Sequence, residues 1–246
     1  APTTPPTEQS EPTPMPEPTE VAGLPGNVVR SEVQREMTPN VNAEQVATRS
    51  ENNNAFAFDL YRTLADREGN LFYSPYSISI ALAMAYAGAE GQTEQQMAET
   101  LRITLAEPAV HAAYNALDLA VTERAEESGG ESEPQSDEGF QLNVANAIWG
   151  QEGYTFRAEY LDGLARHYGS GLRTLDFSGS PDASREVIND WVSQETQGRI
   201  EDLISRGGIT PLTRLVLANA IYFKAAWRYP FTEQLTEELP FTTLEG

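Results

Sequence analysis

The chain has 246 residues, of which 39% are hydrophobic, enough to form one large domain or two small ones. Its 16 Lys and Arg stand against 37 Asp and Glu, a net charge of −21, which argues against binding to nucleic acid or to an anionic membrane surface. The absence of cysteine excludes disulfides, thiol catalysis and cysteine-based metal sites. The sequence has no run of 18 apolar residues, so no transmembrane segment is predicted.

The first residues differ in composition from the rest of the chain. Residues 1–20 are almost wholly Pro, Thr, Glu, Gln and Ser, a composition that buries too little apolar surface to offset chain entropy. We therefore expect residues 1–49 to be a disordered Pro/Thr/Glu-rich tether and residues 50–246 to be globular. Because such spacers commonly hold a domain away from a cell surface, we expect an extracellular or surface-tethered protein.

Apolar periodicity and capping patterns predict the elements of the globular part. Helices are expected at residues 50–69, 76–88, 93–101, 110–126, 156–168 and 181–198. Strands are expected at residues 70–73, 140–149, 172–177 and 215–223. Ser74-Pro75 and Ser180-Pro181 are typical helix starts, and Thr93 with Gln96 has the spacing of a capping box. Residues 126–138, rich in Glu, Ser and Gly, are expected to be a solvated loop.

The strand at residues 215–223 is apolar at almost every position, with Asn219 as its polar exception. Such a strand is covered on both faces, which predicts a central place in its sheet. Helices and strands are mixed without strict alternation, which indicates an α+β fold. A polar residue in such a strand usually has a purpose, so Asn219 should have hydrogen-bond partners.

Sequence motifs of enzymes are missing. There is no nucleophile elbow, no P-loop, no paired-histidine metal motif and no dinucleotide fingerprint. His111 and His167 are the two histidines, each isolated on a predicted helix, and we expect them at the surface or at helix ends. No catalytic residue, metal site or cofactor is therefore predicted, and an unrelated hydrolase is the weakest of the functional hypotheses.

Five segments resemble the serpin family, and they occur in the order found in serpins. They are Asn70–Ser79, Gly88–Met97, Leu142–Trp149, Asn189–Ile200 and Leu217–Trp227, the last followed by Pro230-Phe231. The resemblance covers residues 50–246 and leaves the tether outside. It implies the serpin fold, which is multi-helical with a large central mixed β-sheet.

In serpins the domain continues well beyond the point that matches Gly246, so the resemblance implies an N-terminal half truncated before the reactive-centre loop. The missing part would hold the loop, its hinge, another strand of the central sheet and much of a second sheet. Because the sheet would keep an open edge, we expect this half not to fold alone. We interpret the chain as a fragment.

The resemblance implies a serine-protease inhibitor that has no catalytic residue of its own. The target protease attacks the reactive loop, the loop inserts into the sheet, and the protease is trapped as an acyl-enzyme. The implied partner is a serine protease, with cysteine proteases as a second class, and the full-length protein is expected to be a monomer. Heparin binding is not expected, because residues 110–126 offer little positive charge beyond His111 and Arg124. The alternative is a non-inhibitory serpin that acts as a carrier or chaperone-like protein.

The resemblance also implies roles for eight residues. Ser74, Ser77 and Asn219 match the shutter, a polar cluster beneath the middle of the sheet. Lys224 and Trp227 match the breach, where the loop first enters. The helix lying over the sheet, which must shift to let the loop pass, carries Asn189, Trp191 and Thr196. Taken alone, Ser74 would be interpreted as a helix cap, and the tryptophans as ordinary core or sheet-edge residues.

Overall fold

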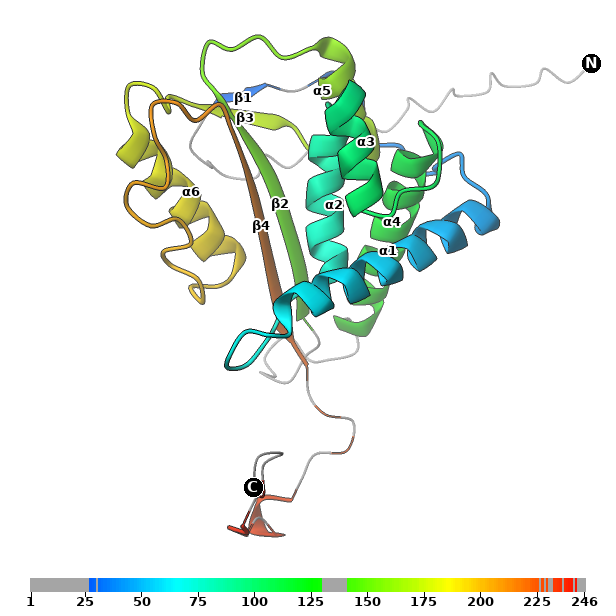
Figure 1. Ribbon diagram of the computed structural model, residues 1–246, viewed down its shortest axis with the longest axis vertical. Helices are drawn as coiled ribbons and strands as arrows, with labels where there is room; N and C mark the ends of the chain where they lie inside the picture. Colours follow the sequence, from blue (N-terminus) through cyan, green and yellow to red (C-terminus); the bar gives the residue numbers. More distant parts are fainter. Residues whose placement is uncertain are drawn as a thin grey trace, which may run out of the picture.

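The computed structural model describes residues 27–29, 31–129, 141–225, 227, 229, 232–235, 237–240 and 242. These residues form six α-helices, four strands and a short 3-10 turn, η1 (Glu233–Leu235). Figure 1 shows the order of the elements along the chain. The α+β class predicted from the sequence is confirmed, since the helices cover a mixed sheet.

Helix α1 (Ala43–Leu64) begins earlier than the expected start at Ser50. Its N-cap is Asn42, whose side chain accepts a hydrogen bond of 2.9 Å from the backbone of Gln45, while the Gln45 side chain accepts one of 3.0 Å from the backbone of Asn42. This capping box satisfies donors of the first turn, so the helix begins there.

Helix α2 (Pro75–Tyr86) begins at the predicted Ser74-Pro75 pair, and the Ser74 side chain accepts a hydrogen bond of 3.2 Å from the backbone of Ser77. The helix is largely buried, as its all-round apolar sequence predicts. The prediction of a strand at residues 70–73 is wrong, because this segment is a loop in which Leu71 and Phe72 are exposed.

Helix α3 (Gly91–Thr100) begins two residues before the predicted start at Thr93. Its N-cap is Glu90, which makes no side-chain cap, and Thr93 lies inside the helix. The Thr93/Gln96 spacing is therefore not a capping box. Helices α4 (Ala109–Gly129), α5 (Ala158–Tyr168) and α6 (Pro181–Glu195) occur where helices were expected. Residues 126–129 of the expected loop belong to α4, and its remainder lies outside the described residues.

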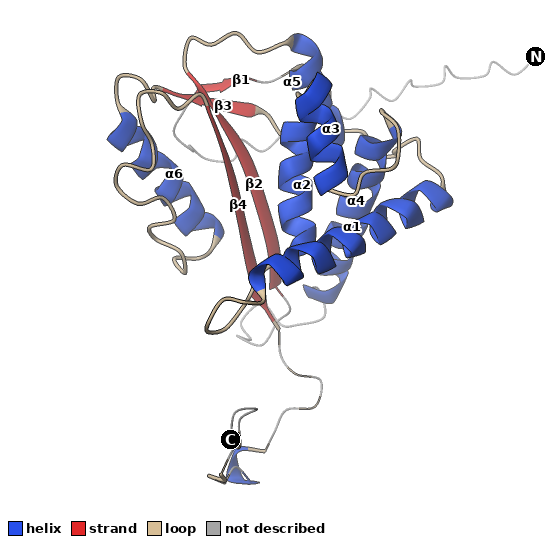
Figure 2. Cartoon of the chain, in the orientation of Figure 1, coloured by secondary structure: helices blue, strands red, loops and turns tan. Residues whose placement is uncertain are grey.

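The sheet has the order β1-β3-β2-β4, with β1 (Asn27–Val29), β2 (Gln141–Gln151), β3 (Leu172–Leu175) and β4 (Leu215–Lys224). Strands β2 and β3 are parallel, whereas β4 runs antiparallel to β2 from Leu215 opposite Gly150 to Lys224 opposite Gln141. Figure 2 shows α6 on one side of the sheet and α1 to α4 on the other.

Strand β4 lies at the edge of the sheet within the described part of the chain, not at its centre as predicted. Both of its faces are nevertheless covered, one by α2 and the other by α6. Coverage by two helix layers therefore accounts for the nearly continuous apolar sequence.

The core divides at the sheet. Between the sheet and α6, Trp149 and Trp191 meet edge to face with ring centres 6.1 Å apart. On the other side, Met84, Ile148 and Leu164 form a second cluster beneath the helices. Within the described residues, no helix is long and apolar enough to cross a membrane.

The expected tether needs a correction. Residues 1–26 and 30 lie outside the described residues, but residues 27–29 form β1, which pairs with β3. Residues 31–36 then contact α5 and α4 before the chain enters α1. The part of the chain in contact with the fold therefore starts no later than Asn27.

Candidate functional site beneath the paired strands

A polar cluster lies where β2, β4 and α2 meet. Asn219 on β4 is the register partner of Asn146 on β2. The Asn219 side-chain nitrogen donates to Asn146 Oδ1 at 2.6 Å, to Ser77 Oγ at 2.5 Å and to the Ser77 carbonyl at 3.2 Å. The prediction that Asn219 has partners is confirmed.

Helix α2 positions the serines of this cluster. Ser77 lies in the first turn of α2 and is fully buried, and its backbone nitrogen donates to Ser74 Oγ at 3.2 Å. Ser74, Ser77 and Asn219, which the resemblance grouped together, are therefore joined by consecutive hydrogen bonds. Ser74 is also the N-cap of the helix, so the capping interpretation holds as well.

Asn146 belongs to the same cluster, although the sequence analysis did not single it out. It interrupts an apolar strand much as Asn219 does, and this was the available signal. The pairing of the two residues depends on the register of β2 against β4, which the sequence does not reveal. The hydrogen bonds of the cluster join β2, β4 and α2, and they persist only while these three elements keep their relative positions.

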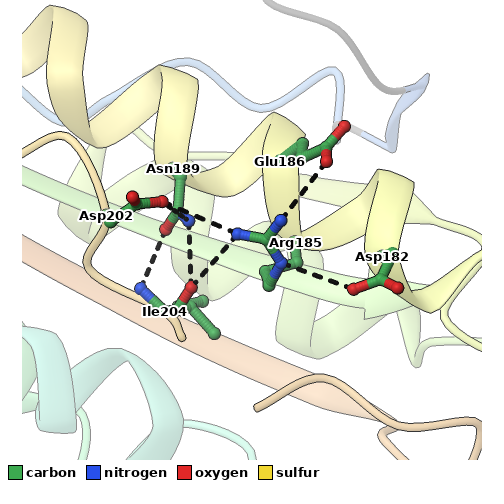
Figure 3. Close-up of polar contacts among 6 residues, drawn as sticks. All are labelled: Asp182, Arg185, Glu186, Asn189, Asp202 and Ile204. Atoms are coloured by element: carbon green, nitrogen blue, oxygen red, sulfur yellow. Dashed lines mark hydrogen bonds and ion pairs between the residues drawn. The ribbon is translucent and has the colours of Figure 1, made fainter. Parts of the chain in front are cut away.

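The second part of the site joins α6 to the segment that follows it, as Figure 3 shows. Asn189 Oδ1 accepts a hydrogen bond of 2.8 Å from the Ile204 nitrogen, and Asn189 Nδ2 donates to the Ile204 carbonyl at 3.0 Å. Asn189 Nδ2 also lies 3.3 Å from Asp202 Oδ1. The amide thus binds both main-chain groups of Ile204, as a neighbouring strand would.

Arg185, one turn before Asn189, strengthens this connection, and the sequence analysis did not single it out. Its side chain is buried, with Nη1 donating to the Ile204 carbonyl at 3.4 Å. Ion pairs link it to Glu186 at 3.3 Å, Asp182 at 3.5 Å and Asp202 at 3.7 Å (Figure 3). An arginine in an amphipathic helix is usually interpreted as a surface residue, so no local signal pointed to Arg185.

The two other residues that the resemblance assigned to the helix over the sheet, Trp191 and Thr196, occupy different positions. Trp191 is buried against the sheet beside Trp149. Thr196 follows the last turn of α6, where its hydroxyl donates to the Val192 carbonyl at 2.8 Å and accepts from the Ile200 nitrogen at 3.1 Å. Thr196 therefore fixes the exit of the chain from α6.

The two breach residues are not brought into this cluster. Lys224 is the last residue of β4, opposite Gln141, and Trp227 beyond it has 78% of its surface exposed. Their role at the entry of a reactive loop stays a prediction.

The two histidines are not isolated, contrary to the sequence analysis. His111 of α4 and His167 of α5 are both buried, with stacked rings 5.9 Å apart. His111 Nδ1 lies 2.6 Å from the Tyr168 hydroxyl, and His111 Nε2 lies 3.2 Å from Glu107 Oε1. Burial, together with the neighbouring His111, lowers the pKa of His167, whereas the hydrogen bond with His111 lowers the pKa of Glu107. Among the described residues, no cluster of acidic and histidine side chains is placed to hold a metal ion.

Comparison with known proteins agrees with this architecture. The family described as "Serpin (serine protease inhibitor)" matches residues 51–246. An uncharacterized serpin-like protein of Thermococcus kodakarensis is 40% identical over 195 residues, covering 78% of this chain and 42% of that protein. Leukocyte elastase inhibitor A of Rattus norvegicus is 37% identical over 191 residues, covering 77% of this chain and 47% of that protein.

Solved structures show the same fold. Emu ovalbumin (Dromaius novaehollandiae) superposes with a TM-score of 0.64 at 29% identity, covering 82% of this chain and 52% of that one. Maspin superposes with a TM-score of 0.69 at 24% identity, covering 82% of this chain and 50% of that one. The chain therefore has a serpin fold and belongs to the serpin family. It spans less than half the length of the curated relatives described above.

Proposed function

We propose that the full-length protein inhibits a serine protease by inserting a cleaved loop into the sheet next to β4. The observation that carries the proposal is the cluster of Asn219, Asn146 and Ser77, which ties β2 and β4 to α2 through side chains. Such bonds hold the sheet in one arrangement and can be broken and remade when its elements shift. Membership of a family described as serine protease inhibitors supports the same function.

In this mechanism the chemistry belongs to the target. The protease serine attacks the carbonyl carbon of one peptide bond in the loop, an ester forms, and the new amino terminus leaves. The loop then adds to the sheet as a strand before water can hydrolyse the ester. Strand β4 is suited to receive it, since among the described residues it has a neighbouring strand on one side only.

Helix α6 is the element that has to yield. It covers the face of β4 together with the segment that contains Ile204, and Asn189 and Arg185 bind that segment to the helix. A strand arriving beside β4 would therefore meet a cover that is held by identifiable bonds. We infer that Asn189, Trp191 and Thr196 act in this displacement.

The test is to incubate the full-length protein with a panel of serine proteases that includes an elastase, because relatives of this chain are named leukocyte elastase inhibitors. A covalent complex that survives denaturing electrophoresis is expected, together with loss of protease activity. A protease with its active-site serine replaced by alanine is the control and should give no complex. Cleavage of the loop by every protease, with activity retained, would favour the non-inhibitory alternative, a carrier or chaperone-like serpin.

We further infer that the protein acts outside the cell or at its surface. The composition of residues 1–20 supports this, since Pro- and Thr-rich spacers separate domains from surfaces. Fractionation of the producing cells, with an antibody against the folded part, would detect the protein in the medium or on the cell exterior. Recovery from the cytosol alone would contradict the inference.

A further inference from the structure

Described residues that precede α1 are attached to the fold by backbone and side-chain bonds, and they lie outside the family-matched residues 51–246. We call the described residues 27–29 and 31–36 the N-terminal strap. It consists of β1 and of a stretch that contacts first α5 and then α4. Figure 1 shows β1 beside β3, at the border of the sheet opposite β4.

The first contact is with the outer edge of β3. Asn27, Val28 and Val29 pair antiparallel with Thr174, Arg173 and Leu172, in that order. Strand β3 pairs with β2 on its other side, so β1 covers an edge that would otherwise be open to another strand. Open strand edges bind extended peptides readily, and proteins commonly cover them.

The second contact is with α5. The Ser31 hydroxyl donates a short hydrogen bond to the Asp162 carboxylate. The Glu36 nitrogen donates to the Arg166 carbonyl at 2.9 Å. Because Arg166 lies in the last turn of α5, its carbonyl has no partner within the helix, and the strap supplies one.

The third contact is with a fully buried amide on α4. Asn115 Nδ2 donates to the Glu36 carbonyl at 2.6 Å, and Asn115 Oδ1 accepts from Arg35 Nε at 2.9 Å. Arg35 Nη2 also pairs with Asp118 at 2.7 Å. Both ends of a buried side chain are thus bonded to the strap, and a buried amide that loses its partners is costly.

We propose that the β3 edge, the end of α5 and the Asn115/Asp118 pair form a peptide-binding groove whose ligand is the strap, and that the strap can leave and be replaced. The groove recognises an extended backbone along β3 and an arginine at the position of Arg35. Residues 37–42 join the strap to α1, and Met37, Thr38 and Asn40 in this connection are exposed. A cut there would turn the strap into a separate ligand. This inference does not rest on protease inhibition.

The test uses the full-length protein with a protease recognition sequence inserted between Thr38 and Pro39. After cleavage, a fluorescent synthetic peptide of residues 27–36 is added, and its binding is followed by anisotropy. Saturable binding to the cut protein is expected, with no binding to the uncut protein. A peptide carrying Arg35→Ala should bind at least about tenfold more weakly, because it lacks the bonds to Asn115 and Asp118.

A peptide carrying Val28→Pro places a proline, a residue disfavoured in paired strands, in the middle of the three residues that pair with β3, and should also bind more weakly. Placing these changes in the peptide keeps the folded protein constant. Equal binding of the Arg35→Ala peptide would overturn the proposal, as would equal binding to cut and uncut protein. A cut strap that never leaves would overturn it too, since the strap would then be a permanent part of the fold.

Discussion

Asn146 and Asn219 face each other across the β2–β4 pair, and Asn219 Nδ2 donates to the side-chain oxygen Oδ1 of Asn146 at 2.6 Å. This bond joins the strands through side chains, in addition to their backbone ladder. Asn219 also donates to Ser77 on α2. A shift of β4 relative to α2 would therefore break the hydrogen bonds between Asn219 and Ser77.

Replacement of Asn219 by alanine should destabilise the full-length protein by about 1–3 kcal/mol, because Ser77 and Asn146 would lose a shared donor. Urea denaturation measures the difference. Asn54→Ala on the exposed side of α1 is the matched control and should lie within about 0.5 kcal/mol of wild type. Equal stability of the two variants would show that the cluster contributes little.

Replacement of Asn189 by alanine should free the segment after α6 from the helix. The Ile204 nitrogen would lose its acceptor, so hydrogen exchange at that amide should speed up by about tenfold or more. Gln194→Ala, at an exposed position of the same helix, is the control and should leave that rate unchanged. An unchanged rate in Asn189→Ala would show that the segment is held by other contacts.

Acid should weaken the packing of α4 against α5 through His167. Burial lowers the His167 pKa below 6.5 in the folded state, so below pH 6.5 the unfolded chain binds more protons and the free energy of unfolding falls. The loss continues until the pH reaches the folded-state pKa. Between pH 7.5 and 5.5, wild type should lose more stability than His167→Gln, as measured by urea denaturation.

Glu107 titrates at lower pH and does not disturb that comparison. Its pKa is lowered below 4.5, so the stability that it contributes is lost only as the pH falls through that region. Equal loss of stability in wild type and His167→Gln between pH 7.5 and 5.5 would contradict the assignment to His167.

Two glycines should respond to alanine in opposite directions. A Cβ atom at Gly150 on β2 would lie 2.4 Å from the Phe156 ring, so Gly150→Ala should destabilise the protein by about 1–3 kcal/mol. A Cβ at Gly163 inside α5 meets nothing within 4 Å, and Gly163→Ala should stabilise by about 0.5–1 kcal/mol. Thermal unfolding of both variants checks the pair, and a destabilised Gly163→Ala would count against the described packing of α5.

The elements that the sequence predicted best are those with strong local signals. The Ser-Pro pairs at residues 74 and 180 start α2 and α6, and apolar runs locate β2 and β4. Strand β1 was missed because a run of three residues is too short to give a periodic signal and forms a strand only by pairing with β3, far along the chain. The clustering of His111 with His167 was missed for the same reason, since it results from packing between α4 and α5.

Site residues that are conspicuous in the local sequence were predicted. Site residues whose role depends on contacts with distant parts of the chain were missed. Asn219 is conspicuous in an apolar strand, and Ser74 and Ser77 were grouped with it by the resemblance. Asn146 needed the strand register, and Arg185 needed the path of the chain after α6. Local sequence carries neither kind of information.

The edge-to-face contact of Trp149 with Trp191 gives the molecule an optical reporter of its own. Trp149 lies on the sheet and Trp191 on α6, and the third tryptophan of the chain, Trp227, is already exposed to solvent. Lifting α6 from the sheet would admit water to both buried indoles and move their emission to longer wavelength. Stopped-flow fluorescence of the unlabelled protein could therefore time the movement of this helix.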